Sequence, residues 1–574
     1  MKDDNRRRLT CDVLVIGSGA SGLAAAVSAA HFGLEVVVAE KAPVFGGTSA
    51  WSGGWLWIPR NPLARAAGVE EPPEAPKEYL RSELGNRAGD PRLEVFLENG
   101  PEMAAFFQDQ AGMRWIGGDR IPDFHATPGA AQGGRSLSVA PYDGRALGPW
   151  IEKLRPPLDV VSLWGMGIAG GADMGHFFKA TRSPRSALYA AGRILRHWRD
   201  LAFHRRGMRL VNGNALVARL MRAALDKGAT LMESAPAKAL LQEEGRVCGA
   251  ILATADGDLE IRAARGVVLA TGGFPHDPAR LEALAGRAGG SGHRSAAPET
   301  NSGDGLRLAE TAGAGVDESL AWSMALAPVS LVPRKDGSFA SFPHLVERAK
   351  PGIFAVSPQG ERFVNEADSY HDFMKAMLEK GFPFCWLVAD HPAQRRWGLG
   401  WSKPFPFPLG GALRSGYLRR GRTLAELARA CGIPAATLEA TAARFNAAAA
   451  RGEDPDFQRG ESLYNRVQGD AGHEPNPSLA PLARGPFYAV KIVPGSLGSF
   501  SGLKTDSAAR VLDGAGRPIP GLFAVGNDMS SIMGGEYPSG GITLGPGMTF
   551  GYIAGRLLAG QPVTGLSSEQ EQTS

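Results

Sequence analysis

A glycine-rich segment near the N-terminus, Gly17-Ser-Gly-Ala-Ser-Gly22, has the spacing of a pyrophosphate-binding turn. It follows an apolar strand and opens an alanine-rich helix, whose N-terminus favours the negative charge of a phosphate. Gly17 allows the tight turn, Gly19 lets the backbone approach the pyrophosphate, and Gly22 permits close packing of the helix. Glu40 ends the next strand, 18 residues after Gly22, where its carboxylate can accept hydrogen bonds from ribose hydroxyls. The segment therefore predicts a dinucleotide site.

The residues after Glu40 indicate which dinucleotide is bound. Lys41 is followed by Gly46-Gly-Thr-Ser-Ala-Trp-Ser-Gly-Gly54, a run of small residues whose backbone can pass close to a flat ring system. This arrangement resembles the FAD-dependent superfamily of fumarate reductases and 3-ketosteroid dehydrogenases, in which such a run wraps the pyrophosphate and the isoalloxazine. Ala270-Thr-Gly-Gly273 and the turn Gly526-Asn-Asp528 follow in the order expected for that superfamily. The resemblance implies that the cofactor is FAD.

The resemblance also implies how FAD is held. No histidine lies between Gly46 and Gly54, the loop in which membrane-complex succinate dehydrogenases attach their flavin, so a noncovalent cofactor is expected. No second GxGxxG follows a strand, so we expect electrons to come from the organic substrate and not from a nicotinamide. The predicted cofactor-binding residues are Gly17, Gly19, Ala20, Ser21, Gly22, Glu40, Lys41, Gly47, Thr48, Ser49, Ser52, Gly53, Gly54, Ala237, Thr271, Gly272, Gly273, Gly526, Asn527, Asp528, Gly541, Ile542 and Leu544.

Elements far apart in the chain must assemble to build this site. Residues 11–41 alternate strand, glycine turn, helix and strand, which is a βαβ unit. A hairpin is expected over 239–265, apolar strands over 266–273 and 521–526, and a helix over 548–558. Because ligands bind at the carboxyl ends of parallel strands, we expect an α/β fold with a Rossmann-like FAD-binding domain assembled from discontinuous segments.

The stretch between these segments has a different composition. Residues 299–488 are richer in aromatic residues and proline, and we expect an inserted α+β domain that caps the substrate. The FAD-binding domain would then comprise residues 1–298 and 489–574. Its first part carries a further insertion at about 150–208, and in the second half of this insertion seven arginines lie among apolar residues. The favoured interpretation is a solvated helix face packed on the body; a helix that lies on a membrane or a partner is the alternative.

Composition excludes several other classes. At 574 residues, with 44% hydrophobic and 21% charged residues, the chain is in the globular range and too long for one compact core. The four cysteines show no CxxC or paired spacing, so no disulfide framework, zinc site or dithiol centre is expected. The net charge of +4 gives little support for nucleic-acid binding. Without a signal-peptide pattern or a long apolar run, the chain is expected to be cytoplasmic, and contact with a membrane surface stays open.

The segment near the C-terminus indicates which group of enzymes within the superfamily the chain resembles. Met533-Gly-Gly-Glu-Tyr-Pro-Ser-Gly-Gly541 looks like the 3-ketosteroid dehydrogenases, whereas fumarate reductases need arginines and histidines to clamp two carboxylates. In the family that this segment resembles, a tyrosine hydroxyl and a backbone N–H four residues later hold the ketone oxygen. By position these groups belong to Tyr537 and Gly541. Removing a proton beside a carbonyl builds negative charge on the oxygen, and two preorganised donors stabilise the resulting enolate.

A second tyrosine is the candidate base. The segment from Gly360 to Tyr370 resembles the family segment whose tyrosine removes the alpha proton, so this role is assigned to Tyr370. A free tyrosine has a pKa of roughly 10, hence a neighbour must activate it. The family supplies another tyrosine ahead of a GGRS-like turn, but Phe124 stands there in this chain. The adjacent His125 is the candidate for proton relay, because imidazole titrates nearer neutrality, and a structural histidine is the alternative.

The sequence thus predicts an FAD-dependent desaturase of a cyclic ketone, in which the beta hydride passes to flavin N5. The resemblance makes a 3-ketosteroid the leading substrate, with a monocyclic ketone such as a cyclohexanone as the alternative. The reduced flavin needs an electron acceptor, a quinone, a dye or oxygen, which the sequence does not identify. A fumarate-type enoate reductase is a second class and requires a convergent arginine pair, with Arg362 as its candidate. A nonenzymatic flavin-binding or membrane-associated protein is the third.

Overall fold

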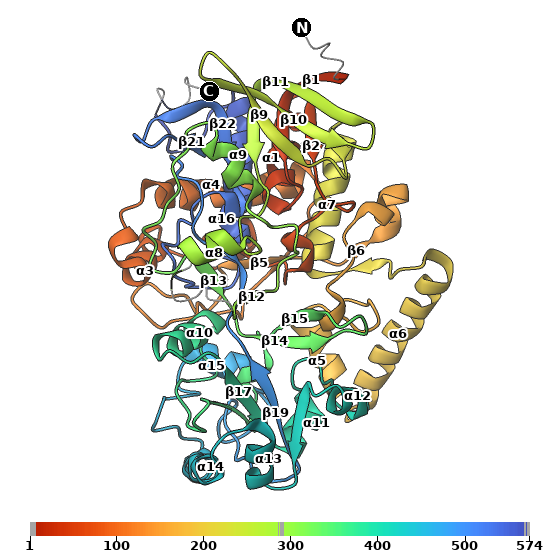
Figure 1. Ribbon diagram of the computed structural model, residues 1–574, viewed down its shortest axis with the longest axis vertical. Coiled ribbons are helices and arrows are strands. Elements are labelled where there is room, and N and C mark those ends of the chain that lie inside the picture. Colours follow the sequence, from red (N-terminus) through yellow and green to blue (C-terminus); the bar gives the residue numbers. More distant parts are fainter. Residues whose placement is uncertain (1–6, 285, 287–291, 568–569, 571–574) are drawn as a thin grey trace.

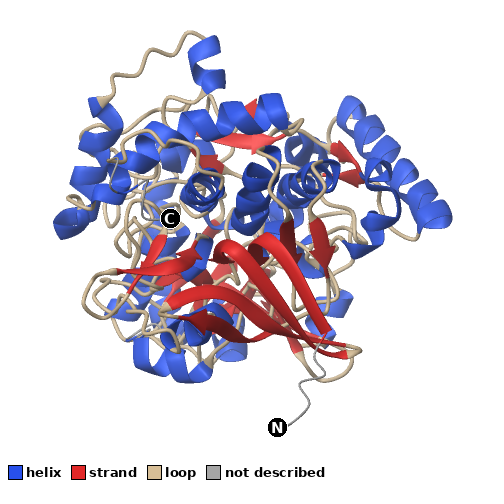
Figure 2. Ribbon diagram, turned by 90° about the horizontal axis from the view of Figure 1, so that it is seen from above, coloured by secondary structure: helices blue, strands red, loops and turns tan. Residues whose placement is uncertain are grey.

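A computed structural model describes residues 7–284, 286, 292–567 and 570 of the chain. The upper part of the molecule in Figure 1 is built on an eight-stranded sheet in the order β21-β22-β11-β1-β2-β8, to which β10 and β9 are added at β11. Figure 2 shows its long strands lying side by side. The strands are β1 (Arg7–Ile16), β2 (Val36–Ala39), β8 (Thr230–Met232), β9 (Ala237–Glu243), β10 (Arg246–Thr254), β11 (Gly257–Leu269), β21 (Arg510–Leu512) and β22 (Pro518–Ala524).

The three segments predicted to form one nucleotide-binding sheet do so. β1 pairs in parallel with β2 on one side and with β11 on the other, and β11 pairs in parallel with β22. Residues 13–16 of β1 and all of β2 are buried. Continuous apolar runs are typical of parallel strands covered on both faces, because helices pack on each side of the sheet.

Two predicted boundaries in this part were wrong. The hairpin expected over 239–265 and the strand expected over 266–273 share β11, a single strand of 13 residues. β1 pairs in parallel with nearly all of β11, while the first half of β11 also pairs antiparallel with β10 and its end pairs in parallel with β22. Gly266 does not break the strand; a Cβ there would lie 2.9 Å from the carbonyl oxygen of Gly521, so glycine permits the close approach of β22.

The C-terminal helix α16 (Leu544–Leu558) also begins earlier than the predicted residue 548. Pro546 lies in its first turn, where the missing N–H costs no hydrogen bond. α16 packs on α1 (Ala20–His31): a Cβ at Gly551 or Gly555 would come within 2.6 Å of α1 atoms. The remaining helices of this part are α2 (Pro62–Ala66), α3 (Glu74–Leu84), α4 (Pro91–Gln110), α7 (Asn212–Asp226), α8 (Pro278–Leu284) and α9 (Asp304–Glu310).

The lower part in Figure 1, which we call the capping lobe, is formed mainly by the stretch that was expected to cap the substrate. It has its own antiparallel sheet, β16-β17-β19-β18, and a second hydrophobic core that includes Phe354, Val388, Leu427 and Phe445. The sheet extends to Ile492, past the boundary predicted at 488. The helices and strands of the capping lobe are β16 (Ile353–Val356), α10 (Tyr370–Glu379), β17 (Cys385–Ala389), α11 (His391–Trp397), α12 (Gly410–Arg414), β18 (Leu418–Gly421), α13 (Leu424–Cys431), α14 (Ala435–Ala449), α15 (Leu463–Gln468) and β19 (Phe487–Ile492).

Short strands connect the two parts. β20 pairs with β12 and β13, and β14 pairs with β15, while β3, β5 and β4 form a small sheet beside the main one. β6 and β7 pair at the base of the insertion. These strands are β3 (Leu56–Trp57), β4 (Trp115–Gly117), β5 (Ser136–Val139), β6 (Tyr142–Asp143), β7 (Arg209–Leu210), β12 (Arg294–Ser295), β13 (Met324–Leu326), β14 (Val329–Pro333), β15 (Phe339–Pro343) and β20 (Gly495–Ser499).

The predicted insertion is helical and contains α5 (Ala172–Lys179) and α6 (Pro184–His204), the long helix at the right of Figure 1. The face of α6 that packs on the body is polar and includes Arg193, His197 and Asp200. Its opposite face exposes Leu188, Leu195, Trp198 and Phe203. This distribution is the reverse of that of an ordinary surface helix.

No helix among the residues that the structure describes is both long and apolar enough to cross a bilayer.

Candidate active site

A cavity of about 450 Å³ runs from the glycine turn after β1 to the edge of the capping lobe. Residues from both predicted parts of the FAD-binding domain and from the capping lobe line this cavity. The predicted site residues that line it are Gly17, Gly19, Ser21, Glu40, Lys41, Gly47, Thr48, Ser49, Ser52, Gly53, Gly54, Phe124, Ala237, Thr271, Gly272, Tyr370, Gly526, Asn527, Tyr537, Gly541 and Leu544.

The end of the cavity near β1 has the shape of a dinucleotide cradle. Gly17 has φ +110°, and a Cβ there would lie 2.1 Å from the carbonyl oxygen of Ala270, so only glycine fits. The N–H of Ala20, at the start of α1, donates to Ser49 Oγ at 3.0 Å. Glu40 is buried, and its Oε2 accepts hydrogen bonds from the N–H and the hydroxyl of Ser18. The backbone turn, the N-terminus of α1 and the carboxylate of Glu40 directly after β2 together fit the pyrophosphate and ribose of FAD.

Some predicted cofactor residues do not line the cavity and instead support its wall. Asp528 is fully buried and accepts hydrogen bonds from the N–H groups of Thr271 at 2.5 Å and Gly273 at 2.9 Å. It thereby joins the chain after β11 to the chain after β22. Gly22 lies against the turn, because a Cβ there would come 2.2 Å from the carbonyl oxygen of Gly17. Ala20 and Ile542 are likewise buried behind the lining.

Sequence reasoning missed Asn301 and Asp304, which also line the cavity. The Asn301 side chain donates to Thr48 Oγ1 at 2.9 Å and to the carbonyl oxygen of Gly272 at 3.0 Å, so it ties two predicted loops together. Asp304 forms an ion pair with Lys41. The run Asn301-Ser-Gly-Asp-Gly305, a glycine turn that opens α9, was the signal that could have identified them.

The two candidate catalytic tyrosines meet at the other end of the cavity. The rings of Tyr370 and Tyr537 lie edge to face with centroids 5.0 Å apart, and both side chains are buried. Gly541 has φ +102°, and its carbonyl oxygen accepts a hydrogen bond from the N–H of Trp57 at 3.1 Å. Within the described part of the chain, the N–H of Gly541 donates no backbone hydrogen bond. That N–H is therefore free to donate to a ligand.

Burial raises the pKa of Tyr370 well above its ordinary value, and interaction with the Tyr537 hydroxyl acts in the same direction. The Arg348 guanidinium opposes this rise, and Tyr370 is also the first residue of α10, where the helix dipole favours a negative charge. Burial likewise raises the pKa of Tyr537. Both phenols are neutral at rest, which suits Tyr537 as a hydrogen-bond donor and requires Tyr370 to lose its proton before it acts as a base.

A third tyrosine, Tyr464, also lines the cavity and was not predicted. Its ring packs on that of Phe124 with centroids 4.6 Å apart, and the Phe124 ring lies 5.8 Å from that of Tyr370. Tyr464 thus brings a phenol from α15 to the place where Phe124 lacks one. Nothing in the local sequence distinguishes it from a core tyrosine.

His125 does not line this cavity. Its ring nitrogens face the carboxylates of Glu83 and Asp372, the latter at 2.8 Å. Burial alone would lower its pKa, but the hydrogen bonds to Asp372 and Glu83 raise it to about 10. His125 is therefore a protonated link between α3 and α10.

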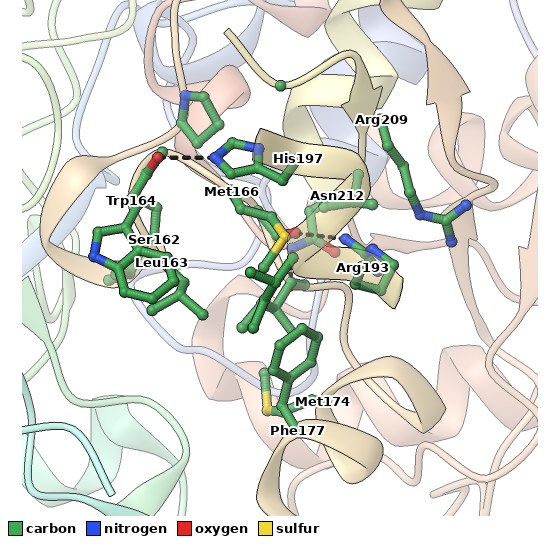
Figure 3. Close-up of a pocket in the computed structure, with 18 of the residues that line it drawn as sticks. Ser162, Leu163, Trp164, Met166, Met174, Phe177, Arg193, His197, Arg209 and Asn212 are labelled. Carbon is green, nitrogen blue, oxygen red and sulfur yellow. Dashed lines mark hydrogen bonds between the residues drawn. The ribbon is translucent and has the colours of Figure 1, made fainter. Parts of the chain in front are cut away.

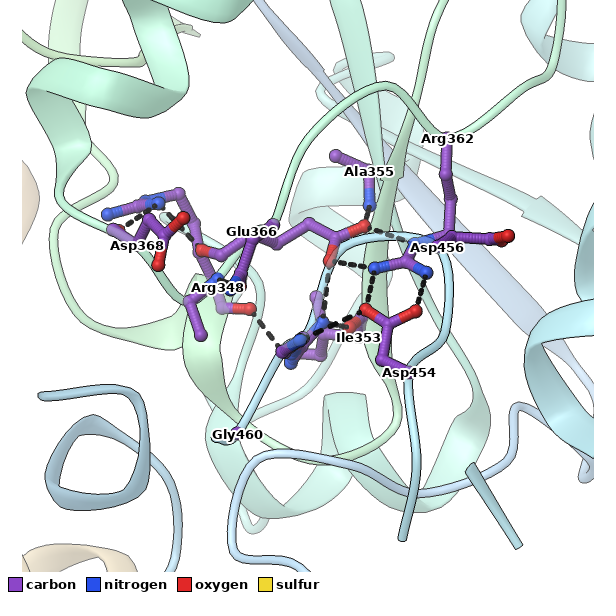
Figure 4. A network of polar contacts seen from close by, with 12 residues as sticks. Arg348, Ile353, Ala355, Arg362, Glu366, Asp368, Asp454, Asp456 and Gly460 are labelled. Carbon is purple, nitrogen blue, oxygen red and sulfur yellow. Dashed lines mark hydrogen bonds and ion pairs between the residues drawn. The ribbon is translucent and has the colours of Figure 1, made fainter. Parts of the chain in front are cut away.

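Arg362, the candidate for binding dicarboxylates, is fully buried and already paired. Figure 4 shows its guanidinium between Glu366 and Asp454, with all four contacts at 2.8 Å. Arg459 also contacts Glu366 at 3.0 Å. Among the described residues that line the catalytic cavity there is no arginine. The arginine pair that a fumarate-type reductase requires is therefore not found in this site.

Comparisons with known proteins agree with this geometry. A family model described as FAD binding domain matches residues 12–544. The 4-oxocyclohex-2-ene-1-carboxylate 5-dehydrogenase of Sinomonas cyclohexanicum is 39% identical over 570 residues, 96% of this chain and 94% of that protein. A 3-oxosteroid 1-dehydrogenase of Mycolicibacterium smegmatis is 36% identical over 565 residues, 95% of this chain and 96% of that protein.

The chain is also similar to a solved structure of 3-ketosteroid delta1-dehydrogenase from Sterolibacterium denitrificans in complex with 1,4-androstadiene-3,17-dione. The sequences are 33% identical, and the TM-score is 0.88, with 96% of this chain and 99% of that chain covered. The protein is therefore a member of the FAD-binding family of flavin-dependent oxidoreductases that includes the 3-oxosteroid 1-dehydrogenases.

Proposed function

We propose that the protein removes two hydrogens from the carbons alpha and beta to the carbonyl of a cyclic ketone and yields the enone. The observation that carries this proposal is the pair of buried phenols, Tyr370 and Tyr537, whose rings lie 5.0 Å apart in the cavity that also holds the FAD cradle. The relatives named above are dehydrogenases of 3-oxosteroids and of oxocyclohexene carboxylates, so a ring ketone is common to them.

Tyr537, Gly541 and Tyr370 have different chemical roles in the proposed reaction. Tyr537 and the N–H of Gly541 donate to the ketone oxygen and stabilise the negative charge that grows there as the alpha proton leaves. Tyr370 takes that proton, and Arg348 together with the N-terminus of α10 favours its phenolate. The cradle that includes Gly17, Gly19 and Glu40 would hold FAD without a covalent link, and FAD would supply the acceptor for the hydride of the beta carbon.

We propose Tyr464, and not His125, as the hydroxyl that assists Tyr370. Tyr464 lines the cavity beside Phe124, whereas His125 is held as a cation by two carboxylates. A cation with a pKa of about 10 is a poor proton acceptor at neutral pH. A phenol in the same apolar enclosure can share a proton with Tyr370 without a change in net charge.

The exposed face of α6 supports contact with an anionic membrane surface. Leu188, Leu195 and Trp198 lie on one stripe of the helix, and Arg185 and Arg199 are exposed beside them. Apolar side chains that enter the headgroup layer next to arginines that attract anionic lipids are the features of an interfacial helix. Such contact would bring the protein close to apolar ketones and to a membrane quinone as electron acceptor.

The test uses purified holoenzyme under anaerobic conditions. Cyclic ketones of increasing ring number are added, and the flavin absorbance is followed; with an artificial electron acceptor, the enone absorbance is followed in parallel. We expect ring ketones to bleach the flavin and to accumulate as enones. Succinate and fumarate serve as the comparison, and a flavin that responds only to dicarboxylates would overturn the proposal.

A further inference from the structure

The side chain of Asn465 is fully buried in the capping lobe, directly after Tyr464 on α15. Its Oδ1 accepts hydrogen bonds from the side-chain amide of Asn365 at 2.9 Å and from the N–H of Gly460 at 3.0 Å. Its Nδ2 donates to Oδ1 of Asp368 at 2.9 Å. Asn465 therefore joins α15 to the segment that leads into α10.

These partners fix the orientation of the Asn465 amide. The N–H of Gly460 can only donate, so the atom that it contacts is the oxygen of the amide. An ionised Asp368 carboxylate can only accept, so the atom that faces it is the nitrogen. Aspartate at this position would offer two acceptors, and leucine would offer neither group. Of the side chains of this size, only asparagine satisfies both contacts.

The two ends of this bridge lie next to the two groups proposed to share a proton. Tyr464 precedes Asn465 on α15, and Asp368 lies two residues before Tyr370, with which α10 begins. Arg348, which favours the Tyr370 phenolate, donates to the carbonyl oxygen of Asp368 at 3.2 Å (Figure 4). Because Asp368 is fixed beside Tyr370 in this way, its bond to Asn465 sets where the Tyr464 phenol lies.

We propose that Asn465 is a positioning residue, which holds the Tyr464 hydroxyl where it can exchange a proton with Tyr370. The inference rests on the proposed function and on the role proposed there for Tyr464. Within the described chain Asn465 does not line the catalytic cavity, so it acts through Tyr464 and not on the substrate or the flavin. A displacement of about 1 Å at a reacting group can cost about 10²-fold in rate.

Asn465→Asp tests the bridge, because it keeps the size of the side chain and exchanges the donor for an acceptor. Two carboxyl groups then meet where an amide and a carboxylate are 2.9 Å apart. At low pH one of them stays protonated and donates to the other, whereas at high pH both ionise and repel. We expect the limiting rate of flavin bleaching by a ring ketone to fall at least about tenfold below wild type at about pH 9 and no more than about threefold at about pH 6. The half-saturating ketone concentration should stay within about threefold of wild type, because Asn465 does not contact the substrate.

The surroundings of Asp368 place this change in an accessible range of pH. Burial raises the pKa of Asp368 to about 6, and the hydrogen bond from Asn465 acts against this rise. Asp372 on α10 raises the pKa further, while the His125 cation and Arg348 lower it. A carboxyl group in place of the amide replaces a donor with a like charge, so the pair loses its last proton above about pH 6. The rates of Asn465→Asp and wild type should therefore diverge progressively above that pH.

The exchange variant, Asp368→Asn combined with Asn465→Asp, restores the hydrogen bond in the opposite direction. The amide at position 368 then donates to the carboxylate at position 465, which still accepts from Asn365 and Gly460. The rate should return to within about threefold of wild type at each pH, because both the net charge and the contact are recovered. A rate as low as that of Asn465→Asp at about pH 9 would overturn the proposal.

A second cycle asks whether Asn465 acts through Tyr464. In the Tyr464→Phe background, Asn465→Asp should lower the rate by no more than about twofold, since the hydroxyl that it positions is gone. If Asn465→Asp does not fold, Asn465→Ser, which removes the amide without adding a charge, takes its place in this cycle. Additive losses would mean that Asn465 serves another group, and the proposal would be wrong.

Asn446→Asp, on α14 of the same lobe, is the matched control. The Asn446 side chain bonds the backbone of Leu482, to which it donates at 2.9 Å and from which it accepts at 2.7 Å. This variant should keep the wild-type rate within about twofold at both pH values. FAD content and the thermal midpoint show whether each variant has folded. A wild type that bleaches with no ring ketone refutes the proposed function, whereas a wild type that bleaches, with no recovery in the exchange variant, refutes this inference alone.

Discussion

In the proposed reaction, proton removal depends on the hydroxyl of Tyr370. Tyr370→Phe keeps the buried ring against Tyr537 and removes only the oxygen. We expect FAD content to stay the same and the rate of flavin bleaching by a ring ketone to fall roughly 10²- to 10⁴-fold. Tyr552→Phe, at a buried tyrosine that does not line the catalytic cavity, is the control and should keep its rate. A wild-type rate in Tyr370→Phe would require another base.

The hydroxyl of Tyr464 should matter less than that of Tyr370. Burial raises the pKa of Tyr464, so the role proposed for it is to share a proton and not to supply a free phenolate. Tyr464→Phe should lower kcat roughly 10-fold to 10²-fold and alter the pH dependence of kcat, because Tyr370 loses the partner that moderates its ionisation. Stopped-flow rates across pH measure both effects. An unchanged pH profile would assign Tyr464 to packing alone.

At the scale of elements, α6 presents the surface proposed to meet a membrane. Replacing Leu195 or Trp198 with glutamate puts a negative charge on the apolar stripe, and both positions are more than 45% exposed. Each change should weaken cosedimentation with anionic vesicles about tenfold or more, since it removes buried apolar area and repels the lipid. Leu463→Glu, at an exposed leucine outside α6, is the control. Equal binding by all three variants would contradict the role of α6.

The ion-pair cluster of Figure 4 anchors the segment that leads to Tyr370. Arg362 is fully buried between Glu366 and Asp454, and burial would raise the pKa of Glu366, but Arg362 and Arg459 lower it to about 2. Arg362→Met leaves two buried carboxylates without their shared partner and should cost about 3–5 kcal/mol of unfolding free energy. Denaturant unfolding measures this cost.

The matched control for the buried cluster is an exposed ion pair of the same lobe, Arg451 with Glu453. Arg451→Met should cost no more than about 1 kcal/mol, because water screens the exposed charges. Similar costs for the Arg362 and Arg451 variants would mean that the buried cluster does not stabilise the capping lobe.

At the scale of the whole molecule, His125 links the FAD-binding part to the capping lobe through Glu83 on α3 and Asp372 on α10. Its folded pKa of about 10 lies above the unfolded value of roughly 6.5. The stabilisation is therefore complete below pH 6.5, declines as pH rises, and is lost through about pH 10. Thermal midpoints should fall more steeply over this range in the wild type than in His125→Gln. Parallel curves for the two proteins would contradict the link.

The FAD cradle could be predicted because its determinants are local. Gly17, Gly19 and Glu40 occupy set positions in one βαβ unit, and a turn that only glycine can adopt leaves a readable spacing in the sequence. The same holds for Tyr537 and Gly541, which lie in one glycine-rich turn. The bounds of β11 and α16 were harder to predict, because β11 pairs with its neighbour β10 in one half and with the distant β22 at its end, and α16 packs on the distant helix α1.

Tertiary structure alone decided which residues complete the site. Tyr464 packs on Phe124, although more than 300 positions of sequence separate them. His125 is unsuited to act as a base, because the carboxylates of Glu83 on α3 and Asp372 on α10 hold it in its protonated form. A second cavity, beside α6 (Figure 3), is lined by residues of α6 and by Ser52 and Gly53, which lie far apart in the sequence. The amino-acid sequence by itself determined the dinucleotide site, because a phosphate-binding turn is a local property of the backbone, and the resemblance of the loop after Glu40 to a known superfamily indicated FAD. Proton transfer and the space for the substrate depend on distances between remote segments, which no local pattern records.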